Sequence, residues 1–175
     1  MRWILALFII TGCQQSLEYK PSEKSEIVDD IMRKAFIQLQ KEKELSPFGT
    51  GAQMMDEVKM LALAFSYCKE IELEDGRELL IAAINTFLET INADTRILPY
   101  LKPCPFEPKN VQIRIFLRNR DGSPFASGKL CFISAINGTL QYDIHDPQTT
   151  RLKTVYEEPY EEALAKIRST EEQSA

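Results

Sequence analysis

The apolar residues of this chain change their spacing once, near residue 111, and this change limits the folds open to the chain. Beyond that point apolar and polar residues alternate, as they do from Val111 to Leu117, which indicates a half-buried strand. Before it, apolar residues recur every three or four positions, which is the spacing of one helix face. Helices and strands that are segregated along a chain predict an α+β fold.

Three N-terminal helices are expected, over residues 23–44, 53–71 and 77–93. Ser22 suits the N-cap of the first helix, because its hydroxyl can accept a hydrogen bond from a backbone N–H of the first turn. The segment 46–51 contains a proline and two glycines, so we expect it to separate the first helix from the second.

The second and third expected helices rest on their apolar faces. In the second, apolar residues are separated by four, three, four and three positions, which places them on one face. These residues are Met54, Val58, Leu61, Phe65 and Cys68. The third is apolar on almost every side between Leu79 and Ile84, so we expect it to be the central helix of the core.

An antiparallel meander of three to four strands is expected after these helices. The predicted strands are residues 111–117, 129–136, 139–145 and, at the edge, 151–156. Asn137 and Gly138 tolerate positive φ angles and predict a tight hairpin turn. A final helix is expected near Pro159, because proline suits the first turn of a helix. The predicted fold is therefore α+β, with three N-terminal helices, the meander and a C-terminal helix.

The composition is that of one ordinary globular domain. The chain has 175 residues, of which 44% are hydrophobic and 27% charged, enough for a core that needs no disulfide bridges. Its net charge of −5 weighs against a general nucleic-acid binder. We place a single α+β domain at residues 23–170 and a polar tail at residues 171–175.

The N-terminus carries a short apolar run that is preceded by Arg2. The run, Trp3 to Ile10, is too short to cross a bilayer as a helix but long enough for the apolar core of a signal peptide. It ends in Ile10-Thr11-Gly12-Cys13, which resembles the lipobox of bacterial lipoproteins. The alternative is a buried N-terminal strand that happens to end in Gly-Cys.

The resemblance implies that this chain is attached to a membrane through a lipid anchor. It implies that residues 1–12 are a removed signal peptide, that Cys13 carries acyl chains, and that residues 13–22 are a tether. Gln14 takes the place of the aspartate that retains many such proteins at the inner membrane. This favours the periplasmic face of the outer membrane over the inner membrane.

The single histidine, His145, is the first candidate for chemistry. It shares a strand face with Asp143 and Gln141, because the three alternate along one expected strand. A general base oriented by an acid is one interpretation, and an exposed histidine near a strand end is the other. One histidine and no Cys-x-x-Cys motif weigh against a zinc site, and we expect no metal or cofactor.

Three cysteines remain beside Cys13. Cys68 lies on the apolar stripe of the second expected helix, where cysteine behaves as a small hydrophobe. Cys104 and Cys131 are the pair that a disulfide would join with least conflict with the core. A nucleophile pair of Cys104 with His145 is a further alternative, which requires the two to meet in the fold.

A basic stretch interrupts the acidic chain between Lys109 and Lys129. Arg114 and Arg118 flank Phe116 on one strand face, as in a patch that binds an anionic glycan, a lipid headgroup or an acidic protein surface. Two alternatives remain open. The acidic last helix covers this patch, or Phe116 belongs to the core.

These observations favour a lipid-anchored protein of the bacterial cell envelope that binds or assembles another envelope component and is not an enzyme. One alternative is an envelope hydrolase that uses Cys104 or His145 with Asp143. Another is a periplasmic domain that binds a small ligand or acts as an inhibitor.

Overall fold

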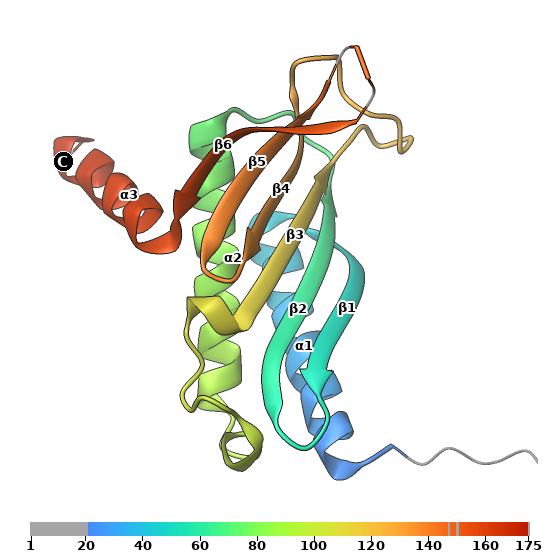
Figure 1. Ribbon diagram of the computed structural model, residues 1–175, viewed down its shortest axis with the longest axis vertical. Helices are drawn as coiled ribbons and strands as arrows, with labels where there is room; N and C mark the ends of the chain where they lie inside the picture. Colours follow the sequence, from blue (N-terminus) through green and yellow to red (C-terminus); the bar gives the residue numbers. More distant parts are fainter. Residues whose placement is uncertain (1–20, 147, 150, 175) are drawn as a thin grey trace, which may run out of the picture.

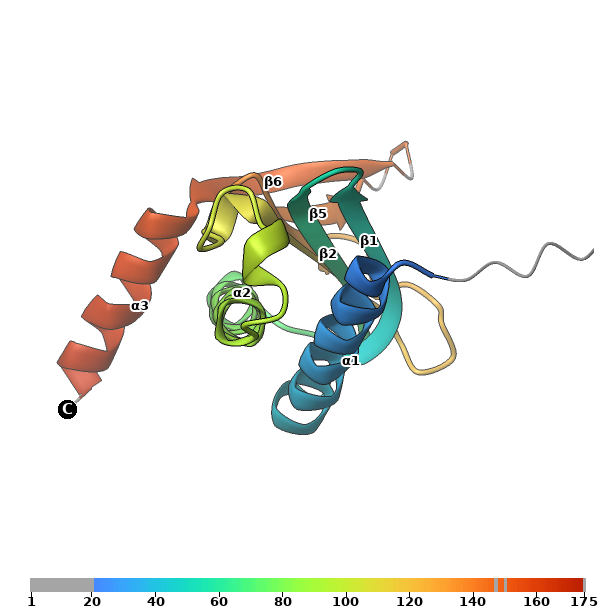
Figure 2. The same cartoon turned by 90° about the horizontal axis from the view of Figure 1, so that it is seen from below.

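The fold is a six-stranded sheet with its helices on one side (Figures 1 and 2). The computed structural model describes residues 21–146, 148–149 and 151–174. Its helices are α1 (Glu23–Lys43), α2 (Leu73–Ala93) and α3 (Tyr160–Ser174). Its strands are β1 (Ser46–Met54), β2 (Val58–Tyr67), β3 (Val111–Leu117), β4 (Leu130–Ile136), β5 (Thr139–His145) and β6 (Leu152–Pro159).

The strands lie in the sheet in the order in which they occur along the chain. Strands β2 and β3 are parallel, and all other neighbours are antiparallel. Parallel neighbours need a crossover connection, and α2 with two short 3₁₀ turns, Leu98–Tyr100 and Pro108–Asn110, supplies it. The sheet therefore consists of a β1–β2 hairpin joined side by side to a four-stranded meander.

The expected arrangement of three N-terminal helices and a short antiparallel meander is wrong. Residues 53–71 do not form a helix; most of them belong to the β1–β2 hairpin. Strand β2 is paired on both sides and points Leu61, Leu63 and Phe65 into the core. A buried central strand has few polar positions, so its apolar residues also fit the spacing of a helix face.

The residues of strand β1 do not predict a strand, because they include proline and glycine, which are typical of turns. Pro47, Gly49 and Gly51 lie within it. An edge strand tolerates proline and glycine because one of its sides is not hydrogen-bonded to a neighbour. The segment that we expect to break the chain therefore forms the edge of the sheet.

The remaining elements agree with the sequence. Helix α1 begins after Ser22, whose side chain accepts a hydrogen bond from the backbone N–H of Ser25. Helix α2 is the central helix, with Leu80, Ile84 and Phe87 fully buried. Strands β3, β4 and β5 match the predicted strands, and the edge strand β6 is followed directly by α3.

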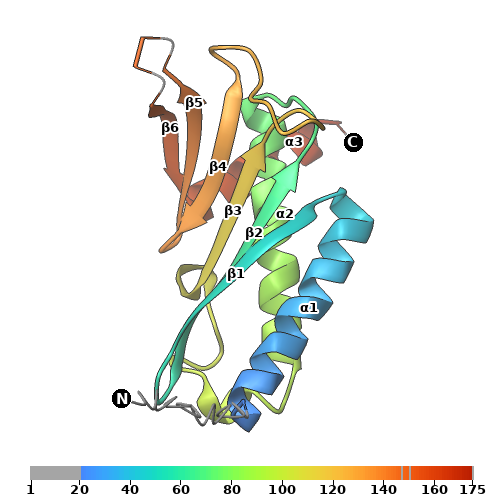
Figure 3. The same cartoon turned by 90° about the vertical axis from the view of Figure 1, so that its right-hand side faces the viewer.

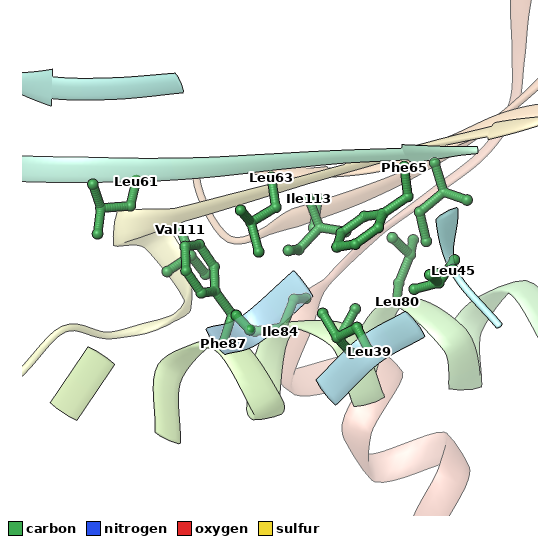
Figure 4. Close-up of a cluster of buried hydrophobic side chains, with 14 of the residues drawn as sticks. Leu39, Leu45, Leu61, Leu63, Phe65, Leu80, Ile84, Phe87, Val111 and Ile113 are labelled. Atoms are coloured by element: carbon green, nitrogen blue, oxygen red, sulfur yellow. The ribbon is translucent and has the colours of Figure 1, made fainter. Parts of the chain in front are cut away.

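The core lies between the sheet and the helices α1 and α2. Figure 4 shows β2 and β3 side chains meeting those of the two helices, with Leu63 and Ile113 facing Ile84 and Leu39. Helix α3 packs against α2, on the same side of the sheet (Figure 2). In the part of the chain that the structure describes, no helix is long and apolar enough to cross a membrane.

Candidate functional site: the open face of the sheet

The sheet surface that points away from α1 and α2 is called the open face below; no described helix covers it (Figure 3). Four paired residues cross it side by side on strands β2 to β5: Ala64, Arg114, Ser134 and Gln141. Phe116 and Phe132 are paired one step further along β3 and β4. Because alternate residues of a strand share a face, they lie on the open face too.

An aromatic row runs over one part of the open face. The ring centroids of Phe48 and Phe116 are 5.0 Å apart, and those of Phe116 and Phe132 are also 5.0 Å apart. Phe48 lies at a register shift of β1, where a bulge re-aims a side chain, and it is 58% exposed. The guanidinium carbon of Arg118 lies 4.9 Å from the Phe48 centroid and 5.9 Å from that of Phe116.

Beside the aromatic row the open face has a hollow with a volume of about 250 Å³. The floor of this hollow consists of small residues from β1 and β2: Gly49, Gly51, Ala62 and Ala64. Phe48, Phe116 and Arg114 line it as well. An apolar hollow with one guanidinium at its border is a shape that can hold an apolar group attached to an anion.

The two arginines of the predicted patch have no acidic partner among the residues that the structure describes. Arg114 donates a 3.0 Å hydrogen bond from Nη2 to the side-chain oxygen of Gln112. By contrast, Lys109 pairs with a glutamate at the border of the sheet, and Lys129 with two glutamates near the start of α2. The sequence-predicted patch of Arg114, Phe116 and Arg118 is therefore a surface whose charge is not neutralised by the rest of the described chain.

Both alternatives to a binding patch are wrong. Helix α3 lies on the other side of the sheet, so it does not cover the patch. Glu157, which precedes it on β6, lies on the open face and accepts a hydrogen bond from Gln141. Glu158 pairs with Arg77 and Lys166, and Glu162 pairs with Lys166. Phe116 is half-buried within the aromatic row and is not part of the hydrophobic core.

Phe48 and the small residues of the floor could not be predicted as site residues from the sequence. Their strand, β1, was expected to be a break between helices, and their approach to Phe116 depends on the pairing of three strands. The one local signal was the alternation of Gly49 and Gly51, which a strand places on one face.

His145 and Asp143 do lie on the same strand, but no hydrogen bond joins them in the described structure. Asp143 is 6% exposed, and its Oδ1 has no hydrogen-bond partner among the described residues. The hydroxyl of Ser134, on the adjacent strand, is likewise buried without a partner. The arrangement of a base oriented by an acid is therefore not formed.

The structure does not bring Cys104 to His145. Cys104 is exposed in the crossing before β3. The β4–β5 turn lies near that end of the sheet, since a side chain added at Gly138 would lie 3.7 Å from Cβ of Lys109. Strand β5 runs from there over seven residues to His145 at the other end of the sheet. A catalytic pair of these two residues is therefore absent from this fold.

The described cysteines are free thiols. Cys131 is buried at the start of β4, where its Sγ lies 3.4 Å from the backbone oxygen of Asp143 and donates to it. Burial, together with the nearby Asp143, raises the pKa of this thiol. A disulfide between Cys104 and Cys131, the pair that would conflict least with the core, is therefore not formed. Cys68 lies exposed after β2, not on a helix stripe.

Within the described residues, no three His, Cys, Asp or Glu side chains are grouped so that they could hold a metal ion. Cys13 and the lipobox lie outside those residues. Comparison of the chain with family models, with curated proteins and with solved structures gives no match.

Proposed function

We propose that this chain is a lipid-anchored protein of the bacterial cell envelope that binds an anionic partner on the open face of its sheet, without catalysis. The observation that carries the proposal is the state of Arg114 and Arg118. Both guanidinium groups lack an acidic partner in the described part of a chain whose net charge is −5. Arg118 lies against the rings of Phe48 and Phe116, and Arg114 lines the same hollow as these two rings.

Arginine next to aromatic side chains is characteristic of binding surfaces. These residue types are enriched where proteins bind one another, because they combine apolar area with directional hydrogen bonds. In this protein the rings of Phe48 and Phe116 hold the Arg118 guanidinium against the sheet. The charge is thus already positioned, and little side-chain freedom is lost when a partner binds.

The anchor places this surface in the envelope. The lipobox-like residues Ile10 to Cys13 would supply the lipid, and residues 13–22 would supply the tether to α1. The absence of an aspartate after Cys13 favours the outer membrane, with the domain on the periplasmic side. An envelope protein with an acidic surface is the partner that fits best. The alternative, a hydrolase that uses Cys104 or His145 with Asp143, receives no support from a pair of Cys104 and His145, because the two lie at opposite ends of the sheet.

Photo-crosslinking in intact cells tests this proposal. Benzoylphenylalanine replaces Phe132 at the end of the aromatic row, and an adduct of defined mass is expected after illumination. The adduct should fall at least tenfold when Arg114→Gln and Arg118→Gln are combined. The matched control carries the same crosslinker at the exposed Ile37 on α1, which should give no such adduct. An adduct that persists without the two arginines would contradict the proposal.

A further inference from the structure

Gly49 is a glycine that neither its backbone nor its neighbours require. Its φ lies outside the left-handed region, and a Cβ added to it would meet no described heavy atom within 4 Å. Glycine weakens a strand because it has no side chain to pack and loses more chain entropy on folding. The feature that this glycine does provide is empty space above the sheet.

That space is the hollow on the open face. Gly49 pairs with Ala64, and Gly51 pairs with Ala62, so four small residues form a block across two strands. The block lies beside the rings of Phe48 and Phe116, which form one wall of the hollow. An aliphatic or aromatic side chain of a partner that lies in the hollow would lose its water and gain apolar contacts with the small residues below it and with the two rings beside it.

A guanidinium lies directly beside the block. Arg114 pairs with Ala64 across β2 and β3 and lines the hollow. One of its N–H groups donates a hydrogen bond to the side-chain amide oxygen of Gln112. The other N–H groups have the fork geometry that binds a carboxylate through two hydrogen bonds. The acids of this face, Asp143 and Glu157, lie on β5 and β6, beyond Arg114 as seen from the hollow.

We infer that the hollow binds an apolar side chain that is flanked by carboxylates, presented by an extended acidic segment of a partner protein. This inference rests on the proposed function and names the chemistry that the open face recognises. Gly49 keeps the hollow open, Arg114 binds the carboxylate, and Arg118 with the aromatic row binds the residues that follow.

The shape and the charge of the site favour a peptide over other sources of a carboxylate or an anion. Sites for small molecules enclose most of the ligand surface, whereas this hollow is shallow and borders the edge strand β1. A chain segment can lie in it and continue past the edge of the sheet. A membrane surface calls for clusters of four or more basic residues, and this face offers two arginines.

Peptide binding to the full chain, purified in a mild detergent, tests this inference. The probe is a blocked, fluorescein-labelled pentapeptide with one leucine between pairs of glutamates, and binding is measured by fluorescence polarisation. We expect saturable binding that falls at least tenfold when glutamines replace the glutamates, and also when alanine replaces the leucine. No binding of the acidic peptide, or equal binding of the glutamine peptide, would overturn the inference.

Gly49→Leu fills the hollow and should also lower the affinity at least tenfold, with a melting temperature no lower than that of the natural chain. The matched control is Gln53→Leu, which adds the same side chain to the same strand outside the hollow and should bind normally. Unchanged binding by Gly49→Leu would show that the hollow is not the site. If the cellular adduct depends on the arginines but not on Gly49, the proposed function stands and this inference fails.

Discussion

At the scale of single residues, Glu158 at the end of β6 has the most buried contacts of any charged side chain that the structure describes. It is 1% exposed and accepts hydrogen bonds from Arg77 Nε at 2.7 Å and from Lys166 Nζ at 2.8 Å. The hydroxyl of Tyr142 donates to it at 3.0 Å. One carboxylate thus joins residues of α2, β5 and α3 to β6.

Removing this carboxylate should destabilise the fold severely. Glu158→Ala leaves the Arg77 guanidinium buried without its ion pair, and breaking a buried pair in this way costs about 3–5 kcal/mol. We expect a loss of that size in the free energy of unfolding measured with urea. Glu157→Ala, next in the chain but exposed, should cost less than about 1 kcal/mol. Equal losses in the two variants would show that the network contributes little.

The same carboxylate should make stability depend on pH in the acid range. Burial by itself would raise the pKa of Glu158, but the hydrogen bonds from Lys166, Arg77 and Tyr142 outweigh it and hold the pKa below 4.5. Because the pKa is lower in the folded chain than in the unfolded chain, the stabilisation is present above about pH 4.5 and is lost as the pH falls below it. Urea unfolding at a series of pH values should show a smaller acid loss in Glu158→Gln than in the natural chain. Parallel curves for the two proteins would refute this.

At the scale of elements, the sequence predicts correctly the helices and strands in which the spacing of apolar residues is unambiguous. Helix α2 is apolar over many turns, and β3 alternates cleanly, so each was assigned correctly. Strand β2 was not, because a short apolar run in a buried strand has too few polar positions to show its period of two. Strand β1 was not predicted, because its proline and glycines are typical of a loop, although an edge strand tolerates them as well.

Two glycines of strand hairpins should respond in opposite ways to one substitution. Gly138, in the β4–β5 turn, has a φ of +77°, which costs a residue with a side chain about 1–2 kcal/mol. Gly49 in β1 has no such requirement. We therefore expect Gly138→Ala to lower the free energy of unfolding by about 1–2 kcal/mol, and Gly49→Ala to leave it unchanged or raise it. Urea unfolding of both variants measures this, and a loss in Gly49→Ala as large as that in Gly138→Ala would count against it.

At the scale of the whole molecule, the candidate site could be predicted in part. Arg114, Phe116 and Arg118 could be placed together from the chain alone because they are close in sequence. Phe48 and the hollow could not, since they depend on the parallel pairing of β2 with β3 across the α2 crossover. The same long-range topology places Cys104 and His145 at opposite ends of the sheet, which no local pattern indicates.

The attachment point of the tether determines which end of the domain lies near a lipid anchor. Helix α1 begins beside the β1–β2 turn, where Lys24 Nζ donates to the backbone oxygen of Asp56 at 3.1 Å (Figure 3). The proposed anchor would therefore hold this end towards the membrane. The open face would then lie along the side of the domain, accessible to a partner that is anchored in the same membrane.

Exchange of one sulfur for oxygen tests the anchor itself. Cys13→Ser removes the atom that receives the diacylglyceryl group and should move the protein from the detergent phase to the aqueous phase in a phase-partition assay, because stable anchoring requires more than one acyl chain. Cys68→Ser makes the same exchange at an exposed cysteine of the domain and should leave the protein in the detergent phase. Mass spectrometry should show acylation of the natural chain and of Cys68→Ser, and none of Cys13→Ser. If the natural chain carries no acyl chain, or if Cys13→Ser is still acylated, the lipid-anchored half of the proposed function is lost, while the binding face can still be tested separately.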